Sequence, residues 1–180
     1  IFSLVGEVTC RSNLFIRSGF YEFNNEIYGP VIVEDCNFSN SSISLLYGDY
    51  VQINRCTFQN NSVVKVWVWS ELSIISCLFS DNWLEGGECA LEVGGFWPDP
   101  EIIIQDCTIR NNTSTGIVGG LGIFSYMGSQ VSVTCENVDF VSNTAPNGSP
   151  VAFVDTDCEL NLNCCEIDEA NIGGEGQINI

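Results

Sequence analysis

A repeated spacing of apolar residues around a cysteine constrains this chain more than any other feature of its sequence. With the cysteine at position zero, positions −5, −3, 0 and +2 are apolar in each copy that contains this cysteine, whereas −2, −1 and +1 are mostly polar. Five copies contain the cysteine, at residues 31–38, 51–58, 72–79, 102–109 and 160–167. Two further copies place Val133, Cys135, Val138 and Phe140, or more loosely Val8, Cys10, Asn13 and Phe15, at these positions.

The spacing is typical of strands and does not fit the helical period. Alternation between −5 and −3 predicts a strand with one buried face. The three-residue step from −3 to 0 predicts a bend, after which a second short strand begins with the same face inward. In the copy around Cys56 we therefore expect Val51, Ile53 and Phe58 inside, and Gln52, Asn54 and Thr57 outside.

The distance between copies predicts the architecture. Cys36 and Cys56 are 20 residues apart and Cys56 and Cys77 are 21 apart, and the later steps of 30, 31 and 27 residues contain inserted loops. A unit of this length cannot bury its own apolar face, so neighbouring units must stack as a solenoid. Each unit also holds another apolar strand, at residues 43–47, 63–69, 90–93, 122–126, 151–154 and 177–180. Three short strands per turn predict an all-β fold, a single parallel β-helix of about seven coils over residues 1–180. The alternative, a β-sandwich, does not explain the cysteine register.

Two short motifs recur within these units. A Phe-x-x-Asn motif occurs at residues 58–61, 79–82 and 140–143, and Gly-Gly segments at 86–91, 119–123 and 173–178 loosely follow a Gly-Gly-Ala-Ile pattern. Through these motifs the chain resembles the right-handed parallel β-helix repeats of the polymorphic outer-membrane proteins. The resemblance spans most of the chain. It implies a right-handed solenoid displayed at a cell surface, with a role in adhesion.

Charge and hydropathy exclude several classes of partner. No apolar run reaches the ~18 residues that a membrane helix needs, so we expect no membrane insertion. The chain has 5 Lys plus Arg against 23 Asp plus Glu, a net charge of −18, and nucleic acids and anionic lipids require a basic surface. Calcium is the natural counter-ion to consider, at residues 155–159 or 166–169. Neither cluster has the Gly-Gly-x-Gly-x-Asp spacing of a calcium-binding repeat, so we expect solvated acidic loops and no cofactor.

Ten cysteines without a histidine or a Cys-x-x-Cys pair give little support to a zinc site. Inward positions predict a ladder of Cys36, Cys56, Cys77, Cys107 and Cys165. Adjacent rungs lie ~4.8 Å apart, which the Cα separation of a disulfide tolerates. Bonds between Cys36 and Cys56 and between Cys77 and Cys107 are candidates, as is one between Cys56 and Cys77. Alternatively these are buried thiols packed as small apolar groups. The cysteines off the ladder are Cys10, Cys89, Cys135, Cys158 and Cys164, and a secreted protein favours pairing among them.

Six Asn-x-Ser/Thr sequons indicate an N-glycosylated, extracellular product. The five expected to carry glycans are Asn37, Asn40, Asn60, Asn111 and Asn147. Of these, Asn40, Asn60 and Asn111 share position +4 and form one column on the solenoid wall.

A second asparagine column occupies position +5, at Asn61, Asn82, Asn112 and Asn143. We expect a left-handed residue at this turn, with amides that bond to the coils on either side. Because this role is structural, the sequon at Asn112 should be unused.

The absence of histidine excludes Ser-His-Asp and Cys-His catalysis, and we expect no enzyme. Arg55 at −1 has Asp35 one coil away and Asp106 in the same column. The two carboxylates permit a glycosidase-type pair, whereas a salt bridge between Arg55 and Asp35 explains the same residues. An acidic wall would also repel a polyuronate substrate.

Tryptophans provide candidate contact residues. Trp67 and Trp69 alternate with valines on one strand, and Trp97 lies in the longest insertion. Exposed tryptophans suit stacking on sugars or contact with a protein. The alternative is that they pack under the inserted loop.

Neither end of the chain shows a cap. The segment 173–180 parallels 119–126, and 1–10 parallels 123–135 if a gap of three residues is allowed, so the chain holds a nearly whole number of coils. Because an uncapped solenoid end stacks on another copy, we expect a head-to-tail contact formed by Ile1, Phe2, Ser3, Leu4, Val5, Gln177, Ile178, Asn179 and Ile180. The alternative is a segment of a longer solenoid whose caps lie outside it.

Together these observations predict an extracellular structural glycoprotein, a β-helical rod that stacks into a filament or forms part of a longer surface solenoid. A surface adhesin that binds glycans or other surface proteins is the first alternative. A polysaccharide-cleaving β-helix enzyme is the second.

Overall fold

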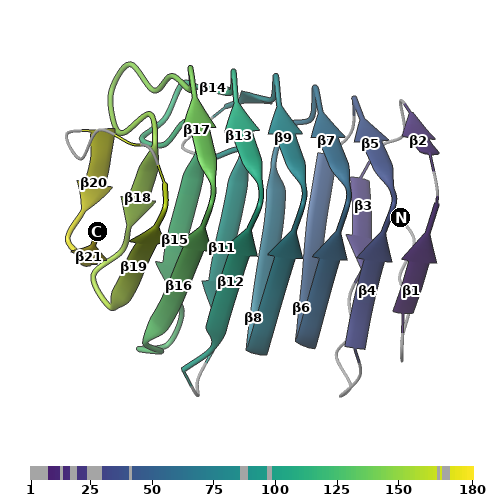
Figure 1. Ribbon diagram of the computed structural model, residues 1–180, viewed down its shortest axis with the longest axis horizontal. Helices are drawn as coiled ribbons and strands as arrows, with labels where there is room; N and C mark the ends of the chain where they lie inside the picture. Colours follow the sequence, from purple (N-terminus) through teal and green to yellow (C-terminus); the bar gives the residue numbers. More distant parts are fainter. Residues whose placement is uncertain are drawn as a thin grey trace.

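The computed structural model describes residues 8–12, 14–16, 20–23, 30–40, 42–85, 89–96, 99–165, 167 and 171–180. Strands of successive turns lie side by side along the long axis, from the N-terminal strands to the C-terminal ones (Figure 1). Every strand pair in the described part of the chain is parallel. The predicted parallel β-helix is therefore confirmed.

Each turn passes through three strand positions. The pre-cysteine strands are β1 (Val8–Arg11), β4 (Pro30–Glu34), the second part of β6 (Ser42–Asn54) and of β8 (Val64–Ile75), β12 (Glu101–Gln105), β16 (Val131–Glu136), β19 (Cys158–Asn163) and β21 (Gln177–Asn179). The post-cysteine strands are β2 (Leu14–Ile16), β5 (Asn37–Ser39), β7 (Thr57–Gln59), β9 (Leu78–Ser80), β13 (Thr108–Arg110) and β17 (Asp139–Val141). The third strands are β3 (Phe20–Phe23), the first part of β6 and of β8, β11 (Leu91–Gly95), β15 (Leu121–Ser125), β18 (Ala152–Val154) and β20 (Ile172–Gly174). A small pair, β10 (Trp83–Leu84) and β14 (Thr113–Ser114), completes the fold.

The predicted register is confirmed for the two copies without a cysteine at position zero. Cys10 pairs with Val33, and Cys135 pairs with Ile104, so both sulfurs lie at −3. In β6 and β8 the third strand continues into the next pre-cysteine strand, so two of the predicted short strands are one bent strand there.

The strand at 177–180 was assigned to the wrong position. Ile178 pairs with Leu160, which places β21 among the pre-cysteine strands, whereas Ile172–Gly174 occupies the third position beside β18. The glycines that suggested the equivalence with 119–126 lie within β20 and in the turn after it. The similar glycine-rich segments 119–126 and 173–180 therefore place their strands at different positions of the coil.

The inward positions form one continuous core. Val51, Ile53 and Phe58 are completely buried and Cys56 nearly so, as expected. The ring of Phe58 stacks between Phe38, at a centroid distance of 5.0 Å, and Phe79, at 4.9 Å. Of the residues expected outside, Asn54 is instead buried, and its Oδ1 atom has no hydrogen-bond partner.

Left-handed residues form the bends at positions −1 and +4, and not at +5 as predicted. Arg55 at −1 has a φ of 51° and Asn60 at +4 has a φ of 55°, and the equivalent residues of other coils match them. Because the chain bends at +4, the side chain at +4 faces water and the side chain at +5 points inward. The bend therefore uses a different asparagine from the one that forms the ladder.

The ladder itself is confirmed at +5, where the asparagine side chains are buried. Asn112 Oδ1 accepts hydrogen bonds from the backbone N–H of Asn82 (3.0 Å) and from its Nδ2 (2.8 Å). Asn112 Nδ2 donates to the Phe79 carbonyl (3.1 Å) and to Asn143 Oδ1 (2.9 Å). Each amide thus bonds a backbone N–H and a backbone carbonyl of the preceding coil in a buried site.

No helix in the part of the chain that the structure describes is long and apolar enough to cross a membrane.

Candidate functional site

Four aromatic rings gather on the outer surface where third strands bend into pre-cysteine strands. We call Trp67, Trp69, Phe96 and Tyr126 the aromatic platform. Phe96 is its centre: the ring stacks on Trp69 at 4.4 Å and contacts Tyr126 at 5.3 Å and Trp67 at 5.7 Å. The rings come from three successive coils, because Trp67 and Trp69 lie on β8, Phe96 follows β11 and Tyr126 follows β15.

The platform is fixed from below and from the side. Trp67 pairs with Gly94 on β11, and a Cβ atom there would lie 2.8 Å from the indole ring, so only glycine lets the ring lie against the sheet. Trp67 Nε1 donates to Glu92 Oε1 (3.1 Å), and Lys65 Nζ pairs with Glu92 Oε2 (3.2 Å). The ring orientation of Trp67 is thereby set before any ligand arrives.

The outer rings remain accessible to solvent. Trp69 is 45% exposed and Tyr126 is 47% exposed, whereas Trp67 and Phe96 are partly buried between them. The predicted contact residues Trp67 and Trp69 are thus brought together at one surface. The third, Trp97, lies outside the described residues.

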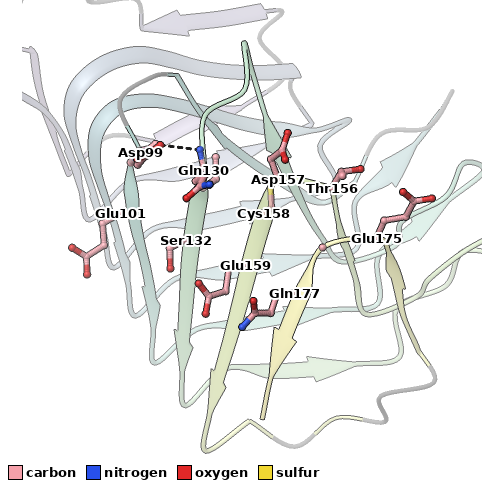
Figure 2. A pocket seen from close by; sticks show the side chains of 13 residues that line it. Asp99, Glu101, Gln130, Ser132, Thr156, Asp157, Cys158, Glu159, Glu175 and Gln177 are labelled. Carbon is pink, nitrogen blue, oxygen red and sulfur yellow. Dashed lines mark hydrogen bonds between the residues drawn. The ribbon is translucent and has the colours of Figure 1, made fainter.

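A groove of about 680 Å³ begins on the other side of the same bend. Glu101, Ser132, Glu159 and Gln177 form a row across β12, β16, β19 and β21, with each residue in register with the next (Figure 2). We call this the acidic groove, because Asp99, Glu101, Asp157, Glu159 and Glu175 line it and none of the described residues in its lining is a lysine or arginine.

The platform and the acidic groove share two loops. After Tyr126 the chain turns back, and Ser129 Oγ donates to the Gly95 carbonyl (2.8 Å). Gln130 N then donates to Asp99 Oδ1 (3.0 Å) at the rim of the groove, a bond drawn in Figure 2. A ligand that lies along this side can therefore contact rings and carboxylates together.

The carboxylates of the groove do not converge on a single point. Glu159 Oε1 accepts a hydrogen bond from Asn179 Nδ2 (2.6 Å). Outside the groove, Asp155 Oδ1 of the first candidate calcium cluster accepts one from the Thr156 amide (2.9 Å). Among the described residues no three acidic or sulfur ligands are placed to hold a metal ion. Residues 166, 168 and 169 of the second candidate calcium cluster lie outside the described residues.

Arg55 and Asp35 form a bidentate salt bridge. Arg55 Nε donates to Asp35 Oδ1 (2.7 Å) and Nη2 donates to Oδ2 (2.9 Å). The hydrogen bonds from Arg55 lower the pKa of the Asp35 carboxyl below its ordinary value. Asp106 accepts a hydrogen bond from Asn137 Nδ2 (2.7 Å). Of the two interpretations for Arg55 and Asp35, the structure shows the salt bridge.

The predicted sulfur ladder is present in the core. Cys36, Cys56, Cys77 and Cys107 are buried in one column, where Cys56 N donates to Cys77 Sγ (3.4 Å) and Cys77 N to Cys107 Sγ (3.4 Å). Burial, and secondarily the carboxylates of Asp155 and Asp157, raise the pKa of the Cys158 thiol to about 12. Disulfide pairing within the column stays a prediction.

The sequon asparagines divide into accessible and inaccessible ones. All five that were expected to carry glycans are exposed, namely Asn37, Asn40, Asn60, Asn111 and Asn147. Asn112 is completely buried in the ladder, so its side chain is not available in the folded protein. Attachment of glycans stays a prediction.

The head-to-tail contact also stays a prediction. Ile1, Phe2, Ser3, Leu4 and Val5 lie outside the described residues. Gln177, Ile178 and Asn179 form β21, and the side chains of Ile178 and Ile180 are exposed.

Sequence reasoning missed Tyr126 and the acidic groove. Ser125 is in register with Gly95, so Tyr126 occupies the position that Phe96 has in the preceding coil. This equivalence between two aromatic residues was the signal that the sequence offered. The residues of the groove face outward, where no apolar period marks them. Their shared feature is acidity, which is spread over the whole chain.

Parallel strands in stacked three-strand coils, with side-chain ladders inside, define the class of β-solenoids. The family of the right-handed β-helix region matches residues 7–174, and the chain belongs to this family. No curated protein gives a match to the chain. The narrower resemblance to polymorphic outer-membrane repeats stays a prediction.

Proposed function

We propose that the chain is an extracellular, non-catalytic β-helix that binds a neutral or cationic carbohydrate on its side, as an adhesin does. The aromatic platform is the observation that supports this proposal. Rings of Trp and Tyr combine an apolar face with a polar edge, which suits stacking on the C–H face of a sugar ring. Three coils spaced ~4.8 Å apart give the platform a length of about 10 Å, room for about two sugar rings.

The surroundings of the platform favour a carbohydrate over an apolar protein surface. The acidic groove adds carboxylates, Ser132 and Gln177 on the strands that follow this bend, and these groups accept hydrogen bonds from hydroxyls or donate to them. Sites for polar ligands typically combine such rings with a few placed polar groups. The carboxylates repel a uronate or sulfated glycan, which limits the ligand to neutral or amino sugars.

Binding to immobilised neutral polysaccharides and to polyglucosamine tests this proposal. Trp69→Ala removes an exposed ring stacked on Phe96, and we expect affinity to fall about tenfold, which corresponds to about 1.4 kcal/mol. Trp83→Ala is the matched control, because Trp83 is 59% exposed on β10, away from the platform. Equal binding by the wild type and Trp69→Ala would contradict the proposal.

A catalytic role is tested in the same samples. We expect no new reducing ends and no unsaturated sugars after long incubation with these polysaccharides. Either product, lost on Glu101→Gln or Glu159→Gln, would replace binding with cleavage as the function.

The extracellular location is supported by the five exposed sequon asparagines. Material from a eukaryotic secretory host should lose mass on treatment with an N-glycosidase. Peptide mapping should find glycans at Asn60 or Asn111 and none at Asn112. A polypeptide without glycans would favour a bacterial surface protein.

Head-to-tail assembly is a separate proposal that the binding function does not need. Electron microscopy of the concentrated protein should show fibres of uniform width if the ends pair. Particles that remain monomeric at high concentration would contradict filament formation and leave side binding unaffected.

A further inference from the structure

The thiol at position zero has the same environment in successive coils. It lies against the carbonyl oxygen of the −3 residue of the preceding coil: Cys56 Sγ is 3.5 Å from the Val33 oxygen and Cys77 Sγ is 3.5 Å from the Ile53 oxygen. Cys107 Sγ is likewise 3.6 Å from the Ile74 oxygen. The position-zero sulfur therefore lies diagonally beside residue −3 of the preceding coil.

At two places this diagonal neighbour is itself a cysteine. Cys36 Sγ is 3.6 Å from the Cys10 oxygen, and Cys165 Sγ is 3.6 Å from the Cys135 oxygen. The sulfurs of Cys10 and Cys36 are 3.5 Å apart. In the sequence, the coils of Cys10 and Cys135 are the two aligned copies without a cysteine at zero, where Asn13 and Val138 stand instead. The cysteine absent from the column thus reappears at the diagonal position, once near each end of the ladder.

We propose that Cys10–Cys36 and Cys135–Cys165 are the structural disulfides of this β-helix. A disulfide needs a Cβ–Cβ distance of about 3.5–4.5 Å. Residues in register on neighbouring parallel strands have parallel Cα–Cβ bonds, so their Cβ atoms stay ~4.8 Å apart. Cys36 and Cys56 are in register, as the pairs on either side of them show. The diagonal pairs avoid this restriction, and rotation about the side-chain bonds can bring the Cys10 and Cys36 sulfurs to about 2.05 Å.

The bonds form by thiol–disulfide exchange with a small-molecule disulfide of the secretory pathway or the medium. The thiolate of the more accessible partner, Cys10 or Cys165, attacks one sulfur of that disulfide and releases a small thiolate. The thiolate of Cys36 or Cys135 then attacks the mixed disulfide and releases the second. Two protein thiols are oxidised, one small disulfide is reduced to two thiols, and the two protons pass to these thiolates.

Burial sets when this exchange occurs. Cys135 and Cys36 are almost fully buried, and burial raises the pKa of the Cys135 thiol well above its ordinary value. Exchange requires the thiolate, so we expect the bonds to form while the coils close and not afterwards.

Refolding in a mixture of reduced and oxidised glutathione tests the assignment. After alkylation and digestion without reduction, mass spectrometry should find Cys10 linked to Cys36 and Cys135 linked to Cys165. The other six cysteines of the ten should be alkylated. A link between Cys36 and Cys56 or between Cys77 and Cys107, one diagonal link without the other, or ten alkylated thiols would overturn the proposal.

Two variants sharpen the map. Cys10→Ser should leave Cys36 alkylated and the Cys135–Cys165 link intact. Cys158→Ser is the matched control, because it removes a buried thiol outside both pairs and should preserve both links. A new link from Cys36 to Cys56 at wild-type yield in Cys10→Ser would show that the diagonal geometry does not select the partner. If Cys10→Ser does not fold, the wild-type map alone decides.

Discussion

The corner after each post-cysteine strand and the corner before each pre-cysteine strand differ in how closely successive coils repeat the same residues. The first repeats the same solution in coil after coil, with a left-handed residue at +4 and a buried asparagine at +5. The second varies in loop length from coil to coil, and there the exposed rings of Trp69 and Tyr126 flank the partly buried Phe96 near the acidic groove. Repetition marks residues that hold the solenoid together. Departure from it marks the surface that we propose as the ligand-binding site.

The largest effect should come from the repeated interior. Phe58→Ala removes a completely buried ring that stacks on Phe38 and Phe79, so a cavity opens between three coils. We expect the free energy of unfolding to fall by about 4 kcal/mol. Urea unfolding measures the change. Phe58→Leu, which keeps most of the volume, should cost clearly less, and equal losses in the two variants would argue against a packing origin.

Asn112→Leu should destabilise the first corner nearly as much. The variant removes the acceptor of the Asn82 N–H and of Asn82 Nδ2, and the donor to Asn143 Oδ1, in a buried site. Each unsatisfied buried group costs about 1–3 kcal/mol, and we expect a total loss of about 3 kcal/mol. Its neighbour gives the control: Asn111 is exposed with a φ of 54°, and glycine adopts this conformation without strain. Asn111→Gly should therefore change stability by less than about 0.5 kcal/mol, and a similar loss in both variants would refute the ladder.

Gly94→Ala should disturb the second corner with a smaller cost in stability. The added methyl group meets the Trp67 ring at 2.8 Å and the Phe124 carbonyl oxygen at 2.9 Å, so the ring must move outward. We expect a loss of about 1–2 kcal/mol, a changed near-ultraviolet circular dichroism signal from tryptophan, and weaker sugar binding. Unchanged binding together with a changed spectrum would show that the orientation of Trp67 is irrelevant to the ligand.

The smallest effect concerns the exposed salt bridge on the wall. Because hydrogen bonds from Arg55 lower the pKa of Asp35, the bridge adds stability above the ordinary carboxyl pKa, about 3.9. This stability disappears as the pH falls through the lowered value. Asp35→Asn should therefore reduce the fall in thermal midpoint on acidification from pH 5 to below pH 3. Arg55→Gln should have the same effect, and the double variant should add nothing further. Additive effects would show that the two residues act independently.

The same contrast explains what the sequence could predict. The −5, −3, 0 and +2 register follows from burial, which permits few residue types, so the core, the ladders and the alignment of Cys10 and Cys135 were predictable. The left-handed position was misplaced by one residue because asparagine suits both roles, the exposed bend at Asn60 and the buried amide at Asn61.

The candidate site was only half predictable. Alternation on β8 identified Trp67 and Trp69, but their contacts with Phe96 and Tyr126 depend on loops whose lengths vary between 20-residue and 31-residue units. Outward positions are not restricted to apolar residues at a fixed spacing, so no sequence pattern reveals the row of Glu101, Ser132 and Glu159. It becomes visible once the register of the parallel strands is known.

The asparagine ladder also allows the number of coils in this β-helix to change. Each asparagine receives from one neighbour the same bonds that it gives to the other, so one coil presents identical partners on its two sides. A duplicated stretch of 21 residues, such as 56–76, would find a complementary surface above and below it. The rod would lengthen by ~4.8 Å while the bend that carries the rings kept its composition. A gene for such a chain can therefore gain or lose whole coils. The length of the rod can then change without a change in the aromatic platform.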